Sequence, residues 1–120
     1  MVRVPTVVIV DDNPAFRKAA ERLLSARGLD VVAGVGSCAA GRDAVAELKP
    51  DGVLLDIELP DGTGYEVARE WNSGSVAPLV VLTSTDECQL ERASLASIGV
   101  RAFIRKEDLA GADLAALFGR

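Results

Sequence analysis

Short apolar runs recur along the 120-residue chain, separated by longer segments with helical periodicity. Each run is rich in Val, Leu or Ile and is bounded by polar or turn-forming residues, which is typical of a buried β-strand. The five predicted strands are Thr6–Val10, Asp30–Gly36, Gly52–Asp56, Pro78–Thr83 and Val100–Ile104.

The segments between these strands predict helices. Between Phe16 and Leu24 apolar residues recur at spacings of three and four, after Asn13 as cap and Pro14 in the first turn, and Gly28 ends this helix. The later helices are predicted from Ser37 as cap to Leu48, from Thr63 or Gly64 to about Trp71, from about Asp86 to Ser97, and from Leu109 to Phe118. The last of these is weak and is broken or bent near Gly111.

This alternation of strands and helices predicts an α/β fold of the (βα)5 type. It is a three-layer sandwich in which helices cover both faces of a parallel sheet. Right-handed crossovers leave few topologies, and we expect the flavodoxin-like strand order 2-1-3-4-5. The length suits one hydrophobic core of ordinary size, so we expect residues 1–120 to form a single domain.

Composition narrows the possible functions. The formal net charge is −5 and no cluster of Lys or Arg offsets it, so we expect no direct nucleic-acid binding by this chain. The chain has no histidine, which removes imidazole as a base, metal ligand or phosphate carrier. Cys38 and Cys88 lack metal-ligand spacing and are expected to be reduced packing residues, which suggests a cytoplasmic location. No apolar run approaches the ~20 residues of a membrane span, so we expect no membrane partner.

Carboxylates and other polar residues follow the strands. The first strand ends at Asp11 and Asp12, and the third ends on Asp56. In the expected order these strands are neighbours, so their carboxyl ends bring three carboxylates to the rim where open α/β sheets bind ligands. Like charges this close require a cation, and oxygen ligands without His or Cys suit Mg²⁺. The fourth strand brings the hydroxyl of Thr83 to the same rim, and the fifth is followed by Lys106.

This set of groups suits phosphoryl transfer to a carboxylate. Asp56 can attack phosphorus and form an aspartyl phosphate, while Asp12, and Asp11 directly or through water, hold the metal. Lys106 would pair with a phosphoryl oxygen as a point charge, and Thr83 would donate a hydrogen bond to another. Because the chain lacks histidine, a phosphohistidine donor must be another protein.

Four segments together resemble the receiver domain of two-component response regulators, and the resemblance covers nearly the whole chain. They are Val8–Asn13, Leu54–Gly64, Val81–Ser84 and Ala102–Lys106. The resemblance implies a regulatory phosphoprotein, not an enzyme with turnover, which catalyses only its own phosphorylation and slow dephosphorylation. It implies Asp56 as phosphoacceptor, with Asp11 and Asp12 as metal-binding acids.

Further roles come from the resemblance alone. The backbone carbonyl of Glu58 becomes an additional metal ligand, Thr83 the switch hydroxyl and Phe103 the switch aromatic. The implied partners are a sensor histidine kinase and an output domain or partner protein. The output contact is the face formed by the fourth helix, the fifth strand and the last helix, and a homodimer on phosphorylation is one form it can take.

The chain also departs from the most common receiver pattern. Glu107 follows Lys106 where many receivers have proline, and the switch aromatic is Phe instead of Tyr. The missing proline, with the sequence from Leu59 to Gly64, is similar to receivers that precede helix-turn-helix DNA-binding domains. We therefore expect either a stand-alone receiver or the receiver part of a transcription regulator whose output domain lies outside these residues.

Two other functions fit parts of this pattern. A small phosphatase or phosphotransferase with an Asp nucleophile is one, because Asp56-x-Glu58 is faintly similar to the haloacid-dehalogenase motif, although that family has Asp at the second acid. A phosphorylation-independent interaction module on the same fold is the other. Such pseudo-receivers usually lose an acid or the lysine, and this chain keeps all of them.

Overall fold

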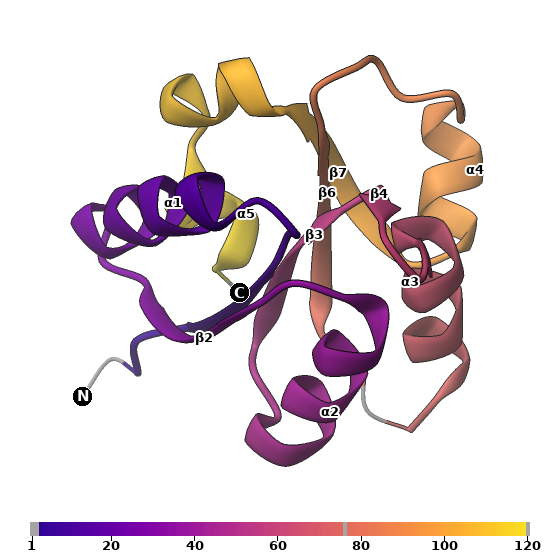
Figure 1. The fold of residues 1–120 in the computed structure, drawn as a ribbon, viewed down its shortest axis with the longest axis horizontal. Coiled ribbons are helices and arrows are strands. Elements are labelled where there is room, and N and C mark those ends of the chain that lie inside the picture. Colours follow the sequence, from indigo (N-terminus) through magenta and orange to yellow (C-terminus); the bar gives the residue numbers. More distant parts are fainter. Residues whose placement is uncertain (1–2, 76, 120) are drawn as a thin grey trace.

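The computed structural model describes residues 3–75 and 77–119. Its central sheet has five parallel strands in the order β2-β1-β3-β6-β7 (Figure 1). Their bounds are β1 Thr6–Val10, β2 Asp30–Val35, β3 Gly52–Asp56, β6 Leu79–Ser84 and β7 Val100–Arg105. Because β6 and β7 are the fourth and fifth strands of this sheet, the predicted order 2-1-3-4-5 is confirmed.

Helices cover both faces of the sheet. They are α1 Pro14–Ala26, α2 Cys38–Leu48, α3 Gly64–Ser73, α4 Arg92–Ser97 and α5 Leu114–Phe118, with a 3-10 helix, η1, at Lys106–Gly111. Helices α2, α3 and α4 lie on one face, and α1, η1 and α5 on the other (Figure 1). No helix in the described ranges combines the length and hydropathy needed to cross a membrane.

Two apolar cores result, one on each side of the sheet. Val8 and Val10 point into the core under α2, α3 and α4, whereas Val7 and Ile9 point into the core under α1 and α5. Successive strand residues face opposite sides, so a strand buried on both faces must be apolar throughout. This explains the unbroken apolar runs of the sequence.

The fourth helix is shorter than its predicted range. It begins at Arg92 instead of about Asp86, and the chain from Thr85 to Glu91 is irregular. The Ser84 side chain accepts a hydrogen bond from the Asp86 backbone N–H at 3.2 Å, which turns the chain locally. Such a side-chain contact competes with helical hydrogen bonding. Glu91, at the N-cap position, makes no side-chain capping hydrogen bond.

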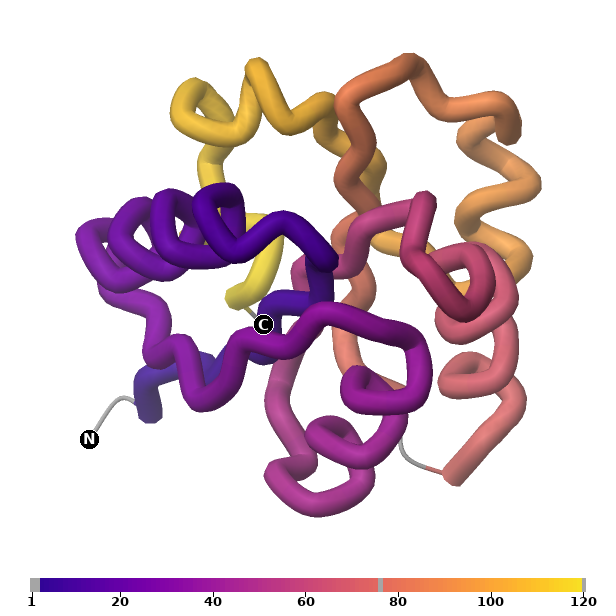
Figure 2. The backbone as a smooth tube through the Cα atoms, in the orientation of Figure 1, coloured from indigo at the N-terminus to yellow at the C-terminus, as the bar shows by residue number. Residues whose placement is uncertain are grey.

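The C-terminal segment breaks near Gly111, as predicted, but its parts differ from the predicted Leu109–Phe118 helix. The 3-10 helix η1 already begins at Lys106, and α5 begins only after Asp113, whose side chain accepts a hydrogen bond from the Ala116 N–H at 3.2 Å. Arg27, at the end of α1, donates hydrogen bonds to the carbonyls of Ala110 and Ala112. Figure 2 shows this C-terminal segment running beside α1.

The structure adds one element that the sequence did not predict. A small antiparallel hairpin of β4 Glu58–Leu59 and β5 Gly62–Thr63 fills the loop after β3. Pro60 and Asp61 form its tip, and Gly62 has φ +155°. Strands of two residues are too short to show a periodic pattern, so the sequence indicated only a turn in this loop.

Gly64 fixes the return of the chain from this hairpin into α3. Its N–H donates to the Ile57 carbonyl at 2.8 Å, and a Cβ atom added there would lie 2.5 Å from the Asp56 carbonyl oxygen. A backbone approach this close admits only glycine. The chain directly after Asp56 is thereby packed against the first turn of α3.

We expect Gly64→Ala to lower the free energy of unfolding by about 2 kcal/mol or more, because the new methyl group would displace the Asp56 backbone. Gly111→Ala is the matched control, since no atom lies within 4 Å of its added Cβ, and it should be neutral or slightly stabilising. Urea denaturation of both variants measures the difference. Equal stability would contradict the close approach at Gly64.

Candidate functional site

The three acids predicted to converge do lie together. Asp11 and Asp12 follow β1, and Asp56 ends β3, the neighbouring strand. One carboxylate oxygen from each lies within 4.8 Å of those from the other two. Asp11 and Asp56 are only 1% and 5% exposed, whereas Asp12 is exposed. Two buried negative charges therefore face each other beneath a third at the surface.

Lys106 supplies the opposing positive charge. It follows β7, and its Nζ lies 2.6 Å from Asp11 Oδ2 and 3.4 Å from Asp56 Oδ2. Burial alone would lower the pKa of this ammonium, but its contacts with Asp11 and Asp56 outweigh that effect and raise the pKa. The side chain is 15% exposed and stays charged among the carboxylates.

One ammonium does not fully compensate two buried carboxylates. The pKa of Asp56 is raised from its ordinary value of 3.8 to about 6, mainly by burial and further by the charge of Asp11. Lys106 and the Glu58 N–H, which donates to Asp56 Oδ1 at 3.4 Å, pull the pKa part of the way back. Asp56 is thus a carboxylate whose negative charge is costly in this state.

The oxygen donors of the site fit a hard divalent cation. Asp11 Oδ1 accepts a hydrogen bond from the Asn13 N–H at 2.9 Å, while the buried Oδ2 has no hydrogen-bond donor within the described residues besides its ion pair with Lys106. A carboxylate oxygen has two lone pairs, so Oδ2 can still contact a metal ion beside this ion pair. The acid cluster that the sequence predicted could therefore bind one.

A cleft of about 440 Å³ opens over these groups. Its walls combine the carboxyl ends of β1, β3, β6 and β7 with the hairpin after β3. The lining includes Asp12, Asp56, Glu58, Thr85 and Lys106. Polar atoms provide much of this lining, so the cleft suits a small hydrated or anionic ligand. It gives access to Asp56, whose own side chain is almost covered.

Thr83 lies beside Asp56 in the sheet. The two residues are register partners on β3 and β6, and the Thr83 carbonyl accepts a hydrogen bond from the Ile57 N–H at 3.0 Å. Its side chain is 1% exposed, and its hydroxyl has no partner within the described part of the chain. A buried hydroxyl without a partner destabilises the fold by about 1–3 kcal/mol. The sequence predicted Thr83 as the last residue of this strand, but the strand continues to Ser84.

Phe103 does not belong to the acid cluster. It is half-buried on β7 and packs against the core under α2, α3 and α4. With Cys88 and Leu95 it lines a separate cavity of about 460 Å³ between α4 and β7. An aromatic side chain at the edge of such a cavity has space beside it.

Asp61 has a contact that sequence reasoning missed. Its carboxylate accepts hydrogen bonds from the backbone N–H groups of Cys38, at 2.7 Å, and Ala39, at 3.0 Å. These bonds, that of Ala39 first, lower the pKa of Asp61. The hairpin tip is therefore tied to the N-terminus of α2, where Ser37 already caps Ala40. No local signal exists for a cap 23 residues away in the chain.

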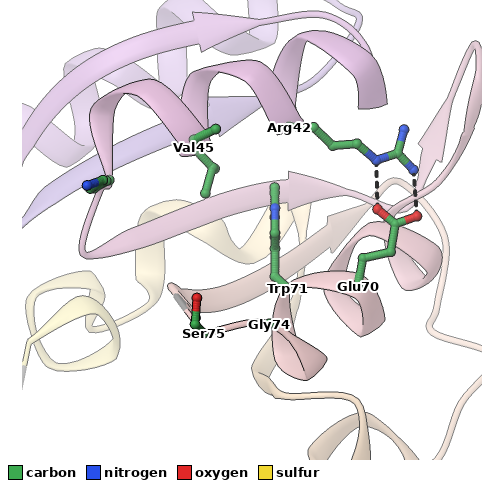
Figure 3. A pocket seen from close by; sticks show the side chains of 8 residues that line it. Arg42, Val45, Glu70, Trp71, Gly74 and Ser75 are labelled. Carbon is green, nitrogen blue, oxygen red and sulfur yellow. Dashed lines mark hydrogen bonds and ion pairs between the residues drawn. The ribbon is translucent and has the colours of Figure 1, made fainter.

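A third cavity, of about 310 Å³, lies between α2 and α3 (Figure 3). Arg42 forms a bidentate ion pair with Glu70 at 2.7 and 2.9 Å along one side, and the ring of Trp71 stands beside Val45. No residue of the acid cluster lines this cavity.

Comparison with known proteins identifies the family. The model of the response regulator receiver domain matches residues 7–116, almost the whole chain, and the chain belongs to this family. Among solved structures, the signal receiver domain of NarL from Mycobacterium tuberculosis superimposes with a TM-score of 0.83 at 27% identity, covering 99% of this chain and 100% of that one. The beryllofluoride-activated receiver domain of RstA from Klebsiella pneumoniae gives a TM-score of 0.79 at 27% identity, covering 93% and 94%.

The curated relatives carry different outputs. The DNA-binding response regulator MtrA of Mycolicibacterium smegmatis is 37% identical over 65% of this chain and 34% of its own length. A protein-glutamate methylesterase/protein-glutamine glutaminase of Myxococcus xanthus is 41% identical over 74% of this chain and 26% of its own length. The chain spans about a third of the length of the first curated relatives. The match is thus to a regulatory module that occurs beside both DNA-binding and enzymatic parts.

The family match decides between the functions that the sequence left open. It covers the segments that carry the acids and the lysine, and it favours the receiver over a small phosphatase. The predicted resemblance to receivers of DNA-binding regulators is confirmed by the match to MtrA, which is described as a DNA-binding response regulator.

The raised pKa of Asp56 predicts a pH-dependent stability in the absence of metal. The folded state holds the proton up to about pH 6, whereas the unfolded chain releases it near 3.8. The stabilisation from that protonation is complete below about pH 4 and is lost as the pH rises through 6. We expect Asp56→Asn, which removes the charge, to exceed wild type in free energy of unfolding by roughly 2 kcal/mol at pH 7.5.

Urea denaturation in EDTA across pH 4.5 to 8 measures this difference. Asp61→Asn, at an exposed carboxylate whose pKa is lowered, should show the opposite sign at pH 7.5. An Asp56→Asn advantage that stays constant over this range would contradict the raised pKa.

Proposed function

We propose that Asp56 is the phosphoacceptor of this receiver domain. The observation that carries the proposal is a buried carboxylate held 3.4 Å from the Lys106 ammonium at the floor of a polar cleft. An oxygen of Asp56 forms a bond to phosphorus as the P–N bond of a phosphohistidine on another protein breaks, and its electron pair leaves with the imidazole. Desolvation makes Asp56 a better nucleophile than a hydrated carboxylate.

Asp11, Asp12 and Asp56, with the backbone carbonyl of Glu58, are the groups that would hold Mg²⁺. When bound, the ion supplies positive charge that offsets the phosphoryl oxygens and the acid cluster. The Lys106 ammonium would form an ion pair with another phosphoryl oxygen. The Thr83 hydroxyl lies next to Asp56 in the sheet and has no hydrogen-bond partner among the residues that the structure describes. It supplies a donor for a further phosphoryl oxygen.

The donor in this proposal is a sensor histidine kinase, and the setting is a two-component system in the cytoplasm. We propose that residues 1–120 form one receiver domain and catalyse only their own phosphorylation and slow dephosphorylation. The acidic charge of −5 supports an output through another domain or protein, and not through direct DNA binding by these residues. The DNA-binding relatives support a transcriptional output.

Acetyl phosphate with Mg²⁺ should add one phosphoryl group to the chain, visible by intact mass. Asp56→Asn should abolish the labelling, because an amide does not form the acyl phosphate. Asp12→Ala should weaken metal binding by removing one ligand, so labelling should require a higher Mg²⁺ concentration. Asp86→Asn, at an exposed acid outside the cleft lining, is the matched control and should label like wild type. Equal labelling of wild type and Asp56→Asn would sink the assignment, and rapid turnover of a small phosphoester would indicate a phosphatase instead.

We also propose Thr83 and Phe103 as the switch pair. A hydrogen bond from the Thr83 hydroxyl to a phosphoryl oxygen would satisfy a donor for which residues 3–75 and 77–119 provide no partner. This difference can shift the population between two states. The start of α4 would move toward the site as this bond forms. Phe103 has a cavity of about 460 Å³ beside it and could change rotamer in response. The output surface is then α4, β7 and the C-terminal helices.

Amide NMR spectra with and without beryllofluoride test this switch. In wild type we expect shifts at Thr83 and through residues 92–118. In Thr83→Val, which keeps the side-chain shape without the hydroxyl, the shifts beyond the cleft should shrink severalfold. The same variant should raise the free energy of unfolding of the unphosphorylated protein by about 1 kcal/mol, because a buried unpartnered hydroxyl is removed. Unchanged spectra for residues 92–118 in wild type would rule out this surface.

A further inference from the structure

Four contacts form a closed ring that links Asp11 of the acid cluster to Lys106 through Asn13 and Phe16. The Asn13 N–H donates to Asp11 Oδ1 at 2.9 Å, and Asn13 Oδ1 accepts from the Phe16 N–H at 3.3 Å. The Lys106 ammonium lies 4.4 Å from the centroid of the Phe16 ring, and it returns to Asp11 through the 2.6 Å ion pair with Oδ2. Asn13 is also the N-cap of α1, so the cap that starts this helix fixes the backbone of Phe16 beside Lys106.

We propose that Phe16 is a positioning residue for Lys106. A lysine ammonium sits on a flexible four-carbon stem and does not aim itself. The negative face of an aromatic ring attracts a cation over it, most strongly where water is partly excluded. Lys106 is 15% exposed and Phe16 is half-buried, so the contact is partly desolvated. The ring therefore holds the ammonium at the edge of the cleft.

This inference rests on the proposed function and deepens it. In that reaction both anionic partners of Lys106 change, since Asp11 shares its charge with the metal and Asp56 becomes an acyl phosphate. An ammonium held by carboxylates alone would lose its anchors as it is needed at a phosphoryl oxygen. The ring of Phe16 carries no charge to neutralise, so it keeps its hold on Lys106 while the other partners change.

Packing alone does not account for this arrangement. Phe16 and Leu23 lie seven residues apart on α1, so they share one helix face, and both pack against the core under α1 and α5. Only Phe16, in the first turn, also contacts a cation. A leucine at position 16 could fill the same apolar space but would offer no ring to the ammonium. Leu23 is therefore the matched control for packing on this helix.

The test compares initial labelling rates with limiting acetyl phosphate and saturating Mg²⁺. We expect Phe16→Leu to slow labelling by about 3- to 10-fold, the effect of losing a partly buried cation–π contact. Phe16→Tyr, which keeps the ring, should restore most of the rate. Leu23→Ala should lower thermal stability while labelling at the wild-type rate. Pentafluorophenylalanine at position 16, which keeps the ring shape and reverses its quadrupole, should label as slowly as Phe16→Leu.

A second measurement is independent of phosphorylation. The ring current of Phe16 should shift the ε-methylene protons of Lys106 upfield in the NMR spectrum, and this shift should vanish in Phe16→Leu and persist in Phe16→Tyr. If wild type labels and both Phe16→Leu and the pentafluoro ring match its rate, the positioning role is overturned while the proposed function stands. If wild type fails to label although the upfield shift is present, the proposed function fails and the positioning role falls with it.

Discussion

Two buried carboxylates share one ammonium at the rim of this sheet, and the rest of the site depends on that imbalance. Asp11 and Asp56 lie on neighbouring strands, and Lys106 reaches both, yet burial still leaves the pKa of Asp56 near 6. The fold holds such a cluster because two apolar cores fix the strands on which the acids stand. Excess negative charge in a polar cleft has a physical consequence. The site gains free energy from any cation it binds, and a phosphoryl group can enter only with added positive charge.

Sequence reasoning found most of the fold because the signals are local. Apolar runs such as Thr6–Val10 and caps such as Asn13 and Ser37 depend on nearby residues, and the resulting elements agree closely with the structure. The predicted start of α4 was too early because a hydrogen bond from the Asp86 backbone N–H to the Ser84 hydroxyl turns the chain where the helical pattern is weak. The hairpin after β3 was missed because two-residue strands have no period.

The candidate site likewise has parts that the sequence predicts and parts that it does not. The sequence was sufficient to predict that four charged residues converge, because strand order alone places the ends of parallel strands at one edge. These residues are Asp11, Asp12, Asp56 and Lys106. Two other contacts depend on the directions of side chains from elements far apart in the sequence. They are the hydrogen bonds of the Asp61 carboxylate at the N-terminus of α2 and the contact of the Phe16 ring with Lys106. Phe16 gave only the signal of a core residue. No rule of spacing indicates that its ring also faces a cation.

The placement of β7 has a mechanical consequence. It is an edge strand, hydrogen-bonded to β6 alone, and its register is already irregular near Val100. Interior strands such as β3 form backbone hydrogen bonds along both edges, whereas β7 forms them along one. A displacement of β7 therefore disturbs roughly half as many backbone hydrogen bonds. Phe103 enters the core under α4, and the next residue, Ile104, enters the core under α1 and α5. A small displacement of this single strand would therefore be transmitted to both faces of the molecule.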